Sequence, residues 1–378
     1  MTESPRSDAS GGEQPAHPQD TGQPTLTVEG MGAYLECPRK FQFAHERSLR
    51  SPPDDTAVDR LELLRTAICD GFRWAATTDD GATDDPEQLI RHIQNRFRTL
   101  WEGHTERFHS AVQRRHEHRV MEATLEAYVD HCGAEHLEGI ASLSTQSTAR
   151  ELIGPTLPVA TTVQIGHNLP EEASEEESAL DQHSTARLTA EIDYATVEGS
   201  TLVGVKLVPT PAHLGLLRYR NRWDGDVEQA FLDHFDSETE TFDPGLVSSL
   251  FEISVVLGGL RTLRDQANLD SVRTCRYVQV PLVDRQNRTI NRFRDQISVE
   301  LESIDLTDRY LDHHTFGLTH EHRNRTVDDR LQTVARRAID DEYEPVPWEL
   351  IRRESCSECP YTVCCSDYIE AEVRFDGR

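Results

Sequence analysis

The spacing of apolar residues indicates that the first third of the chain is helical. Between residues 27 and about 132, apolar side chains recur every three or four positions, which is the period of a helix buried on one side. A long charged helix is expected over residues 105–131. The apolar positions that define the two helices before it are Leu61, Leu63, Leu64, Ile68 and Phe72, then Leu89, Ile90, Ile93, Phe97 and Leu100.

Beyond residue 147 the pattern changes to the alternation that is typical of strands. Residues 148–163 have β-like character, and residues 188–196 and 201–208 alternate in the strand manner. The Val-Glu-Gly-Ser run between the last two predicts a hairpin turn. A helix, a strand and a further helix are expected at 246–263, 276–283 and 325–340. This order predicts an α/β fold in which a small mixed sheet is flanked by helices.

Composition adds an expectation about the solvent in which the chain works. The 378 residues carry a formal net charge of −28, which would ordinarily argue against a nucleic-acid partner. Only Lys40 and Lys206 are lysines among the 39 basic residues, so 39 − 2 = 37 are arginines. Abundant carboxylates with almost no lysine resemble the composition of haloarchaeal proteins, in which acidic surfaces maintain solubility at high salt. Net charge therefore says little here about partners.

The ends of the chain and its hydropathy suggest a cytoplasmic location. Residues 1–26 are rich in Ser, Gly, Gln, Pro and Asp, and we expect them to form a disordered tail, with a second tail at 369–378. The sequence contains no run of 18 apolar residues, so no membrane partner is expected. In a cytoplasmic protein, clustered cysteines indicate a metal site more often than disulfides.

Four of the eight cysteines have the layout of a split metal site. Cys37 stands alone in a Cys-Pro-Arg-Lys-Phe run, and Cys356, Cys359 and Cys365 form a C-x2-C-x5-C cluster more than 300 residues away. Three clustered thiolates need a fourth ligand, and Cys37 is the candidate. Zinc is an alternative occupant. Cys364 adjoins Cys365, and only one of the two is expected to be a ligand.

This cysteine pattern, together with the strand pair near residues 188–208, resembles the PD-(D/E)XK nucleases of the RecB/AddB type and the CRISPR-associated RecB-like exonucleases. The resemblance covers residues 27–368. It implies one domain with a restriction-endonuclease-like core at 147–283, a helical part at 27–135, and C-terminal helices and the cysteine cluster at 284–368. It also implies a [4Fe-4S] cluster on Cys37, Cys356, Cys359 and Cys365 that staples the two ends of the domain.

The nuclease residues of that family are only partly present. The resemblance places a ligand for Mg²⁺ or Mn²⁺ at Asp193 and the catalytic lysine at Lys206, but Gly204 stands where a second metal-binding carboxylate belongs. Glycine has no ligand atoms. We expect Asp193 and Lys206 to lie on adjacent antiparallel strands with their side chains on one face of the sheet, which Gly204 shares.

Two further family motifs are absent. The family's Gly-x-x-x-His helix corresponds to a segment with Arg65 and Cys69, and its Gln-x-x-x-Tyr helix to one with Ser249 and Ile253. Glu252, in the second helix, is a candidate for the migrated carboxylate that some members of the superfamily use. Cys69 is expected to be a buried thiol. We therefore expect a nuclease fold whose catalysis has decayed.

A run of arginines interleaved with aromatic residues follows the Lys206 strand. Guanidinium groups suit phosphate contacts, and aromatic rings suit base stacking on a single strand. A surface loop that packs its aromatic rings inward is the alternative. The residues of this run are Arg218, Tyr219, Arg220, Arg222 and Trp223.

Together with the resemblance, these observations predict a DNA-binding protein that acts on single strands or DNA ends. The resemblance implies a role in DNA repair or recombination beside a superfamily-1 helicase. Two alternatives remain: an active metal-dependent exonuclease, and a zinc-stapled scaffold that does not bind DNA.

Overall fold

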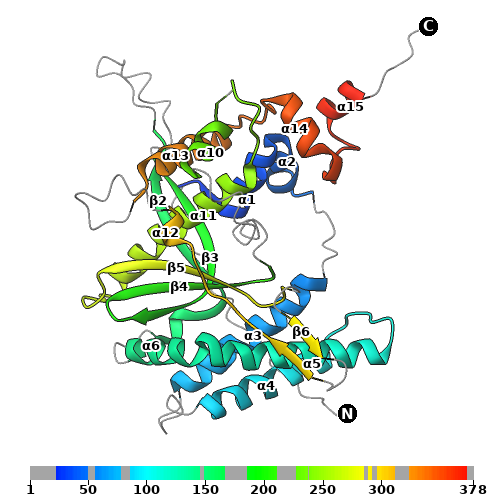
Figure 1. Ribbon diagram of the computed structural model, residues 1–378. Helices are drawn as coiled ribbons and strands as arrows, with labels where there is room; N and C mark the ends of the chain where they lie inside the picture. The colour runs from blue at the N-terminus through cyan, green and yellow to red at the C-terminus, as the bar shows by residue number, and fades with distance from the viewer. Residues whose placement is uncertain are drawn as a thin grey trace, which may run out of the picture.

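The computed structural model describes residues 23–49, 56–77, 86–144, 149–166, 185–210, 227–236, 238–284, 288–291, 296–310 and 323–372. Within these ranges the protein is mixed α/β, with one main sheet flanked by helices (Figure 1). The fold class expected from the sequence is therefore confirmed at this level.

The main sheet contains six strands: five follow the order β1-β3-β4-β5-β8, and the sixth, β2, pairs with β3 on the edge opposite β1. Strand β3 runs antiparallel to β2 and β4, whereas β1 pairs parallel with β3, and β4 parallel with β5. The strands are β1 (Thr25–Thr27), β2 (Ile153–Gln164), β3 (Thr185–Glu198), β4 (Thr201–Val208), β5 (Thr274–Pro281) and β8 (Ile304–Asp305). Thr25 and Leu26, which were expected to belong to the N-terminal tail, form part of β1.

The predicted hairpin joins β3 to β4 in antiparallel register. Gly199 in its turn has a φ of 59°, a left-handed conformation that a residue without a Cβ adopts readily. Because the turn is only two residues long, Tyr194 pairs with Val205 and the neighbouring Asp193 and Lys206 lie close together on adjacent strands.

Four of the N-terminal helices, α3 to α6, cover the sheet at its lower side in Figure 1. The expected long helix over 105–131 begins later, at α5, where the Ser110 side chain caps the helix by accepting a hydrogen bond from the Gln113 N–H. The helices are α1 (Val28–Glu36), α2 (Pro38–Phe41), α3 (Thr56–Thr77), α4 (Pro86–Gly103), α5 (Ala111–Tyr128) and α6 (Ala134–Ser144).

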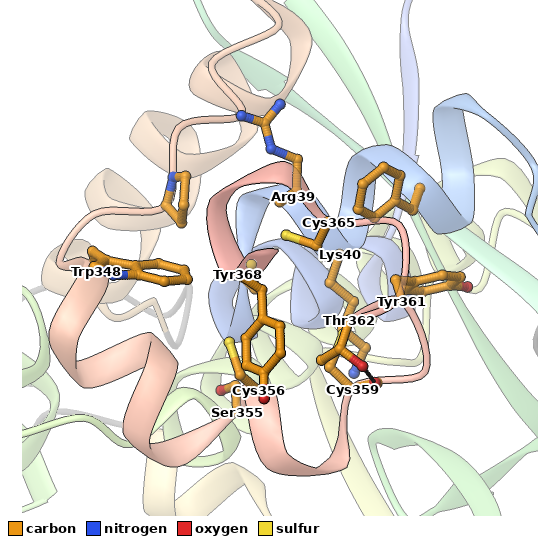
Figure 2. A pocket seen from close by; sticks show the side chains of 13 residues that line it. Arg39, Lys40, Trp348, Ser355, Cys356, Cys359, Tyr361, Thr362, Cys365 and Tyr368 are labelled. Atoms are coloured by element: carbon orange, nitrogen blue, oxygen red, sulfur yellow. Dashed lines mark hydrogen bonds between the residues drawn. The ribbon is translucent and has the colours of Figure 1, made fainter. Parts of the chain in front are cut away.

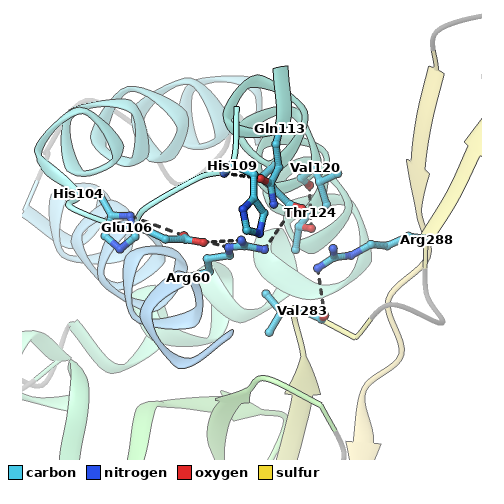
Figure 3. Close-up of polar contacts among 10 residues, drawn as sticks. Arg60, His104, Glu106, His109, Gln113, Val120, Thr124, Val283 and Arg288 are labelled. Carbon is cyan, nitrogen blue, oxygen red and sulfur yellow. Dashed lines mark hydrogen bonds and ion pairs between the residues drawn. The ribbon is translucent and has the colours of Figure 1, made fainter. Parts of the chain in front are cut away.

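A buried polar network ties α3 to the segment before α5 (Figure 3). Arg60 donates to both carboxylate oxygens of Glu106, at 3.1 and 2.5 Å, and to Glu117 at 2.9 Å. The Glu106 side chain is only 4% exposed. A buried carboxylate of this kind needs its bidentate arginine, so this network holds the helical layer together.

Helix α11 (Pro244–Gln266) is the central helix, and its sides contact β2, β3, β4 and β5. Asp243 caps it by accepting from the Leu246 N–H, and Pro244 occupies its first turn. Among the described helices it alone is long and apolar enough to cross a membrane, and 56% of its apolar window is buried within the fold. This burial is typical of a core helix.

The C-terminal helices lie against the N-terminal ones, and Figure 1 shows α14 and α15 beside α2. The Tyr34 hydroxyl donates to the carbonyl of Glu342 at 2.6 Å, and the Tyr361 hydroxyl donates to the carbonyl of Leu49 at 2.8 Å. The remaining elements are α10 (Val227–His234), α12 (Thr307–Tyr310), α13 (Arg325–Ile339), α14 (Trp348–Glu354), α15 (Ser366–Glu372) and a separate hairpin of β6 (Arg288–Asn291) and β7 (Gln296–Val299). Helix α15 extends into the expected C-terminal tail as far as residue 372.

Candidate functional site

The four predicted cysteines line one small cavity between the two ends of the chain. Cys37 precedes α2, and Cys356, Cys359 and Cys365 lie on the turns between α14 and α15. The cavity measures about 20 Å³, which is room for little more than one water molecule. The structure thus brings together cysteines that are more than 300 residues apart in the sequence.

Burial is the main cause that raises the pKa of three of these cysteines, Cys37, Cys356 and Cys365. Burial raises the pKa of Cys37, and the neighbouring Cys359 and Cys365 raise it further. The pKa of Cys356 rises to about 11, again through burial first and then through the other three cysteines. Binding of a metal or cluster here must therefore release protons.

The adjacent Cys364 is placed differently from Cys365. Cys365 is buried and lines the cavity, whereas Cys364 is exposed and directs its sulfur toward the carbonyl of Tyr361 at 3.3 Å. Of the two neighbours, Cys365 is the one that the fold presents to the other three cysteines.

Aromatic side chains surround the cysteine cavity (Figure 2). Trp348, Tyr361 and Tyr368 line it together with the cysteines, and Arg39 beside it forms an ion pair with Asp367 at 2.9 Å. Four thiols in an apolar shell are the donor set of a four-cysteine iron–sulfur or zinc site. Among the described residues, however, no group of three or more His, Cys, Asp or Glu side chains is arranged to hold a metal ion. Either occupant would therefore require these cysteines to change position.

The carboxylate of Asp193 is fully buried, and both of its oxygens are hydrogen-bonded. Arg65 of α3 donates from Nε to Oδ1 at 2.6 Å, and the backbone N–H of Leu207 donates to Oδ2 at 2.6 Å. Burial raises the pKa of Asp193, and the Arg65 guanidinium, the Leu207 N–H and the Lys206 charge oppose that rise. The Asp193 side chain is 0% exposed, so solvent does not reach it.

The amine of Lys206 is paired with Glu252, the one candidate carboxylate on α11. The Nζ–Oε1 distance is 2.5 Å, and the hydroxyl of Tyr277 donates to the same Oε1 at 2.8 Å. Gln279 in turn donates to the Tyr277 hydroxyl at 2.9 Å. Lys206 and Glu252 are 28% and 19% exposed, so this pair faces partly open space, unlike Asp193.

The expected antiparallel pairing of the two strands is confirmed, and the two charged side chains bond to different helices. Asp193 bonds to α3, whereas Lys206 bonds to α11. Gly204 does face α11 as Lys206 does, because a Cβ built on it would lie 2.9 Å from Cδ1 of Leu260. The two charged groups are close enough for the Lys206 charge to act on Asp193, but each is neutralised by a different helix.

The segment that replaces the family's histidine helix lies beside Asp193. The Cys69 thiol is buried at 3.7 Å from the carbonyl oxygen of Asp193, and burial raises its pKa well above the ordinary value. The sequence identified Arg65 only as a departure from the family's glycine and did not predict its ion pair. The sequence did hold one signal for this ion pair: Arg65 lies four positions before Cys69, in the segment that corresponds to the family's Gly-x-x-x-His helix.

Other predicted site residues add little to the Asp193 and Lys206 region. Ser249 donates its hydroxyl to the carbonyl of Gly245 within α11 at 2.8 Å, and Ile253 is buried in the core. The arginine and aromatic run from Arg218 to Trp223 lies outside the described residues. The sequence analysis missed two residues of β5 that bond near Lys206 and Glu252. They are Tyr277 and Gln279, which are separated by one residue.

Comparison with known proteins does not identify the family. No family model matches the chain, and no curated protein matches it significantly.

Proposed function

We propose that this chain is a DNA-binding protein with a RecB/AddB-like, restriction-endonuclease-like core whose nuclease site no longer cleaves. The observation that carries the proposal is the internal neutralisation of the site: Arg65 pairs with Asp193, and Glu252 pairs with Lys206. A nuclease of this kind needs carboxylate oxygens free to bind a divalent ion and a lysine free to act on the attacking water.

The Arg65–Asp193 pair opposes metal binding for an energetic reason. A divalent ion would have to displace a guanidinium bonded at 2.6 Å from a carboxylate with no solvent exposure. Separating a buried pair leaves an uncompensated charge, which costs about 3–5 kcal/mol. Gly204 offers no ligand in compensation.

The cysteine cavity supports the second part of the proposal, a [4Fe-4S] cluster as a structural staple. The residues that would hold it are Cys37, Cys356, Cys359 and Cys365, and the cluster would supply a covalent link between the two ends of the domain. Such a link closes a loop of more than 300 residues, which is where loop-closure entropy is largest.

The proposed setting is DNA repair or recombination in the cytoplasm, beside a superfamily-1 helicase. A nuclease-like domain that binds a single strand or a DNA end without cutting it can guide that strand for its partner. This part of the proposal rests on the resemblance of the cysteine pattern.

One observation favours the rival, an active exonuclease. Glu252 has a partly exposed carboxylate 2.5 Å from the Lys206 amine, which supports it as the candidate for the migrated carboxylate that some members of the superfamily use. The rival requires Asp193 to exchange Arg65 for a metal ion. Cleavage assays decide between the two.

Anaerobic purification followed by metal analysis and DNA binding tests the proposed function itself. We expect iron and sulfide in the ratio of a [4Fe-4S] cluster, a broad visible absorption band, and binding of a fluorescent single-stranded oligonucleotide measured by anisotropy. Replacing Arg218, Arg220 and Arg222 together by glutamine should weaken that binding. Zinc in place of iron, with no oligonucleotide binding at any salt concentration, would establish the scaffold alternative.

A further inference from the structure

A second cavity, of about 240 Å³, lies at the C-terminal half of α11 and is lined mainly by polar side chains. Gly258, Arg261, Thr262 and Asp265 face it from α11 at the i, i+3, i+4 and i+7 positions that share one helix face. Arg261 is nine residues beyond Glu252, or roughly 13 Å along the helix axis. The cavity is therefore separate from the Asp193 and Lys206 region.

Four arginines from three parts of the chain line this cavity. Arg261 and Arg264 belong to α11, Arg273 precedes β5, and Arg323 precedes α13. One lining side chain, Asp265, is acidic, and it pairs with Arg264 at 2.8 Å. The chain as a whole carries a net charge of −28, so a cavity with a local excess of positive charge differs from the rest of the protein and points to a specific role.

The arrangement costs electrostatic energy in the free protein. Arg261 is half-buried, and burial together with the like charge of Arg323 lowers its pKa. Nearby Asp328 partly offsets this repulsion. An anion bound between the arginines would relieve the repulsion.

Guanidinium groups match the geometry of phosphate oxygens through paired N–H donors. A cavity of about 240 Å³ is smaller than the roughly 300–1,000 Å³ of sites for drug-sized ligands, so it suits one phosphate group and little more. A recess also favours a terminal phosphate, which projects from its nucleotide and carries about −1.5 to −2 charges near neutral pH. A backbone phosphodiester is flanked by sugars on both sides and enters a recess less easily.

At high salt, a recessed arginine site should bind phosphate better than an open basic surface does. At 1 M ionic strength the Debye length is about 3 Å, so an exposed basic patch attracts DNA only at contact distance. Bidentate bonds inside a cavity are screened much less. A protein with this composition therefore gains more from a recessed arginine site than from a basic face.

We infer that this arginine cavity binds a phosphate monoester, which is presented by the end of a DNA strand or by a free mononucleotide. The first source rests on the proposed function, whereas the second does not depend on it.

The first assay measures, by anisotropy or competition, the binding of one single-stranded oligonucleotide prepared in three forms: with a 5′-phosphate, with a 3′-phosphate, or with hydroxyls at both ends. The second assay measures the binding of a mononucleotide and of inorganic phosphate by calorimetry. The exposed Arg273 and Arg323 are replaced together, as Arg273→Gln with Arg323→Gln, because exposed side chains can be changed without disturbing the core. The matched control is Arg91→Gln with Arg98→Gln on the exposed face of α4, which removes the same charge elsewhere. Circular dichroism melts confirm that each variant folds.

We expect a terminal phosphate to strengthen oligonucleotide binding by about tenfold, the effect of one added charged hydrogen-bond pair. The cavity variant should lose this preference and the control should keep it. Binding of the mononucleotide alone, lost in the cavity variant, supports the site with a free nucleotide as its ligand. If no oligonucleotide binds, the proposed function fails while the mononucleotide and phosphate titrations still decide the cavity. The inference is overturned if neither terminal phosphates nor the small phosphates bind in the wild type, or if the cavity variant binds them unchanged.

Discussion

Arg65 donates from Nε to Oδ1 of Asp193 across 2.6 Å, and this bond joins helix α3 to strand β3 at a point shielded from solvent. The two residues are 128 positions apart in the chain. The resemblance to the nuclease superfamily implies a metal ion at this carboxylate. In the structure, the Arg65 guanidinium supplies the positive charge that neutralises it.

Removal of Arg65 should destabilise the protein strongly. Arg65→Ala leaves Asp193 buried without its counter-charge, and we expect a loss of about 3–5 kcal/mol of unfolding free energy. Denaturant titration at high salt measures it. Arg96→Ala is the control, because its pair with Asp70 is partly exposed and should be worth less than about 1 kcal/mol. The double variant Arg65→Met with Asp193→Asn should recover much of the lost unfolding free energy. If this double variant is no more stable than Arg65→Ala, the unpaired charge is not the cause of the loss.

Restoring the missing carboxylate should fail to restore a metal site. A Cβ at position 204 would lie 2.9 Å from Cδ1 and 3.1 Å from Cδ2 of Leu260, so Gly204→Asp forces the Leu260 side chain aside and buries a charge beneath α11. We expect a loss of about 1–3 kcal/mol from overpacking alone. Adding Leu260→Ala provides room and should reduce the steric part. Denaturant titration and manganese calorimetry measure both effects, and wild-type stability of Gly204→Asp with tight manganese binding would contradict this account of Gly204.

Loss of one cavity cysteine should remove the bound group, whereas loss of its exposed neighbour should not. Cys37→Ala should abolish the visible absorption band and lower the unfolding temperature, because it severs the link between the ends of the domain. Cys364→Ala is the control, since Cys364 is exposed and faces the Tyr361 carbonyl. Equal iron content in wild type and Cys37→Ala would rule out Cys37 as a ligand.

Mild acid should destabilise the fold through His136. Burial, with the charges of His131 and Arg276, lowers the pKa of His136 from 6.5 to about 4, and its Nδ1 lies 2.7 Å from the Tyr194 hydroxyl. The unfolded chain therefore binds the proton first, and stability falls as the pH drops from 6.5 through about 4. The loss from this residue is about 3 kcal/mol.

Urea titrations between pH 7 and pH 4 measure this dependence. His136→Gln should show a shallower decline than the wild type, and the exposed control His109→Gln should follow the wild type. Some decline should persist in every variant, because burial also lowers the pKa of His234 to about 4. A His136→Gln profile parallel to that of the wild type would show that His136 is not the source.

The spacing of apolar residues predicted the longer helices and strands, because their form shows in the local sequence pattern. The β3–β4 hairpin follows from alternation and a short turn with Gly199, and α11 follows from an apolar run after an Asp-Pro start. Short strands escaped prediction, because β1 and β8 contain three and two residues and owe their form to pairing with β3 and β5. Such strands have too few positions for a pattern.

The candidate site was predictable in its members and not in its bonds. Asp193, Lys206 and Glu252 were each marked by the sequence, but their partners come from helices that no spacing rule connects to the hairpin. Arg65 could pair with many carboxylates in a chain with 67 of them, and only the packing of α3 against the sheet selects Asp193. The cysteine set was easier to predict, since one lone cysteine and three clustered ones give both the number of residues and their chemistry.

Digestion of end-labelled single-stranded DNA in the presence of Mn²⁺, at high salt, tests the central claim most directly. The account predicts that wild type and Lys206→Ala both bind the strand and that neither shortens it, because Asp193 is held by Arg65 and Lys206 by Glu252. Digestion by the wild type that disappears in both Lys206→Ala and Glu252→Gln would contradict it and establish the active exonuclease.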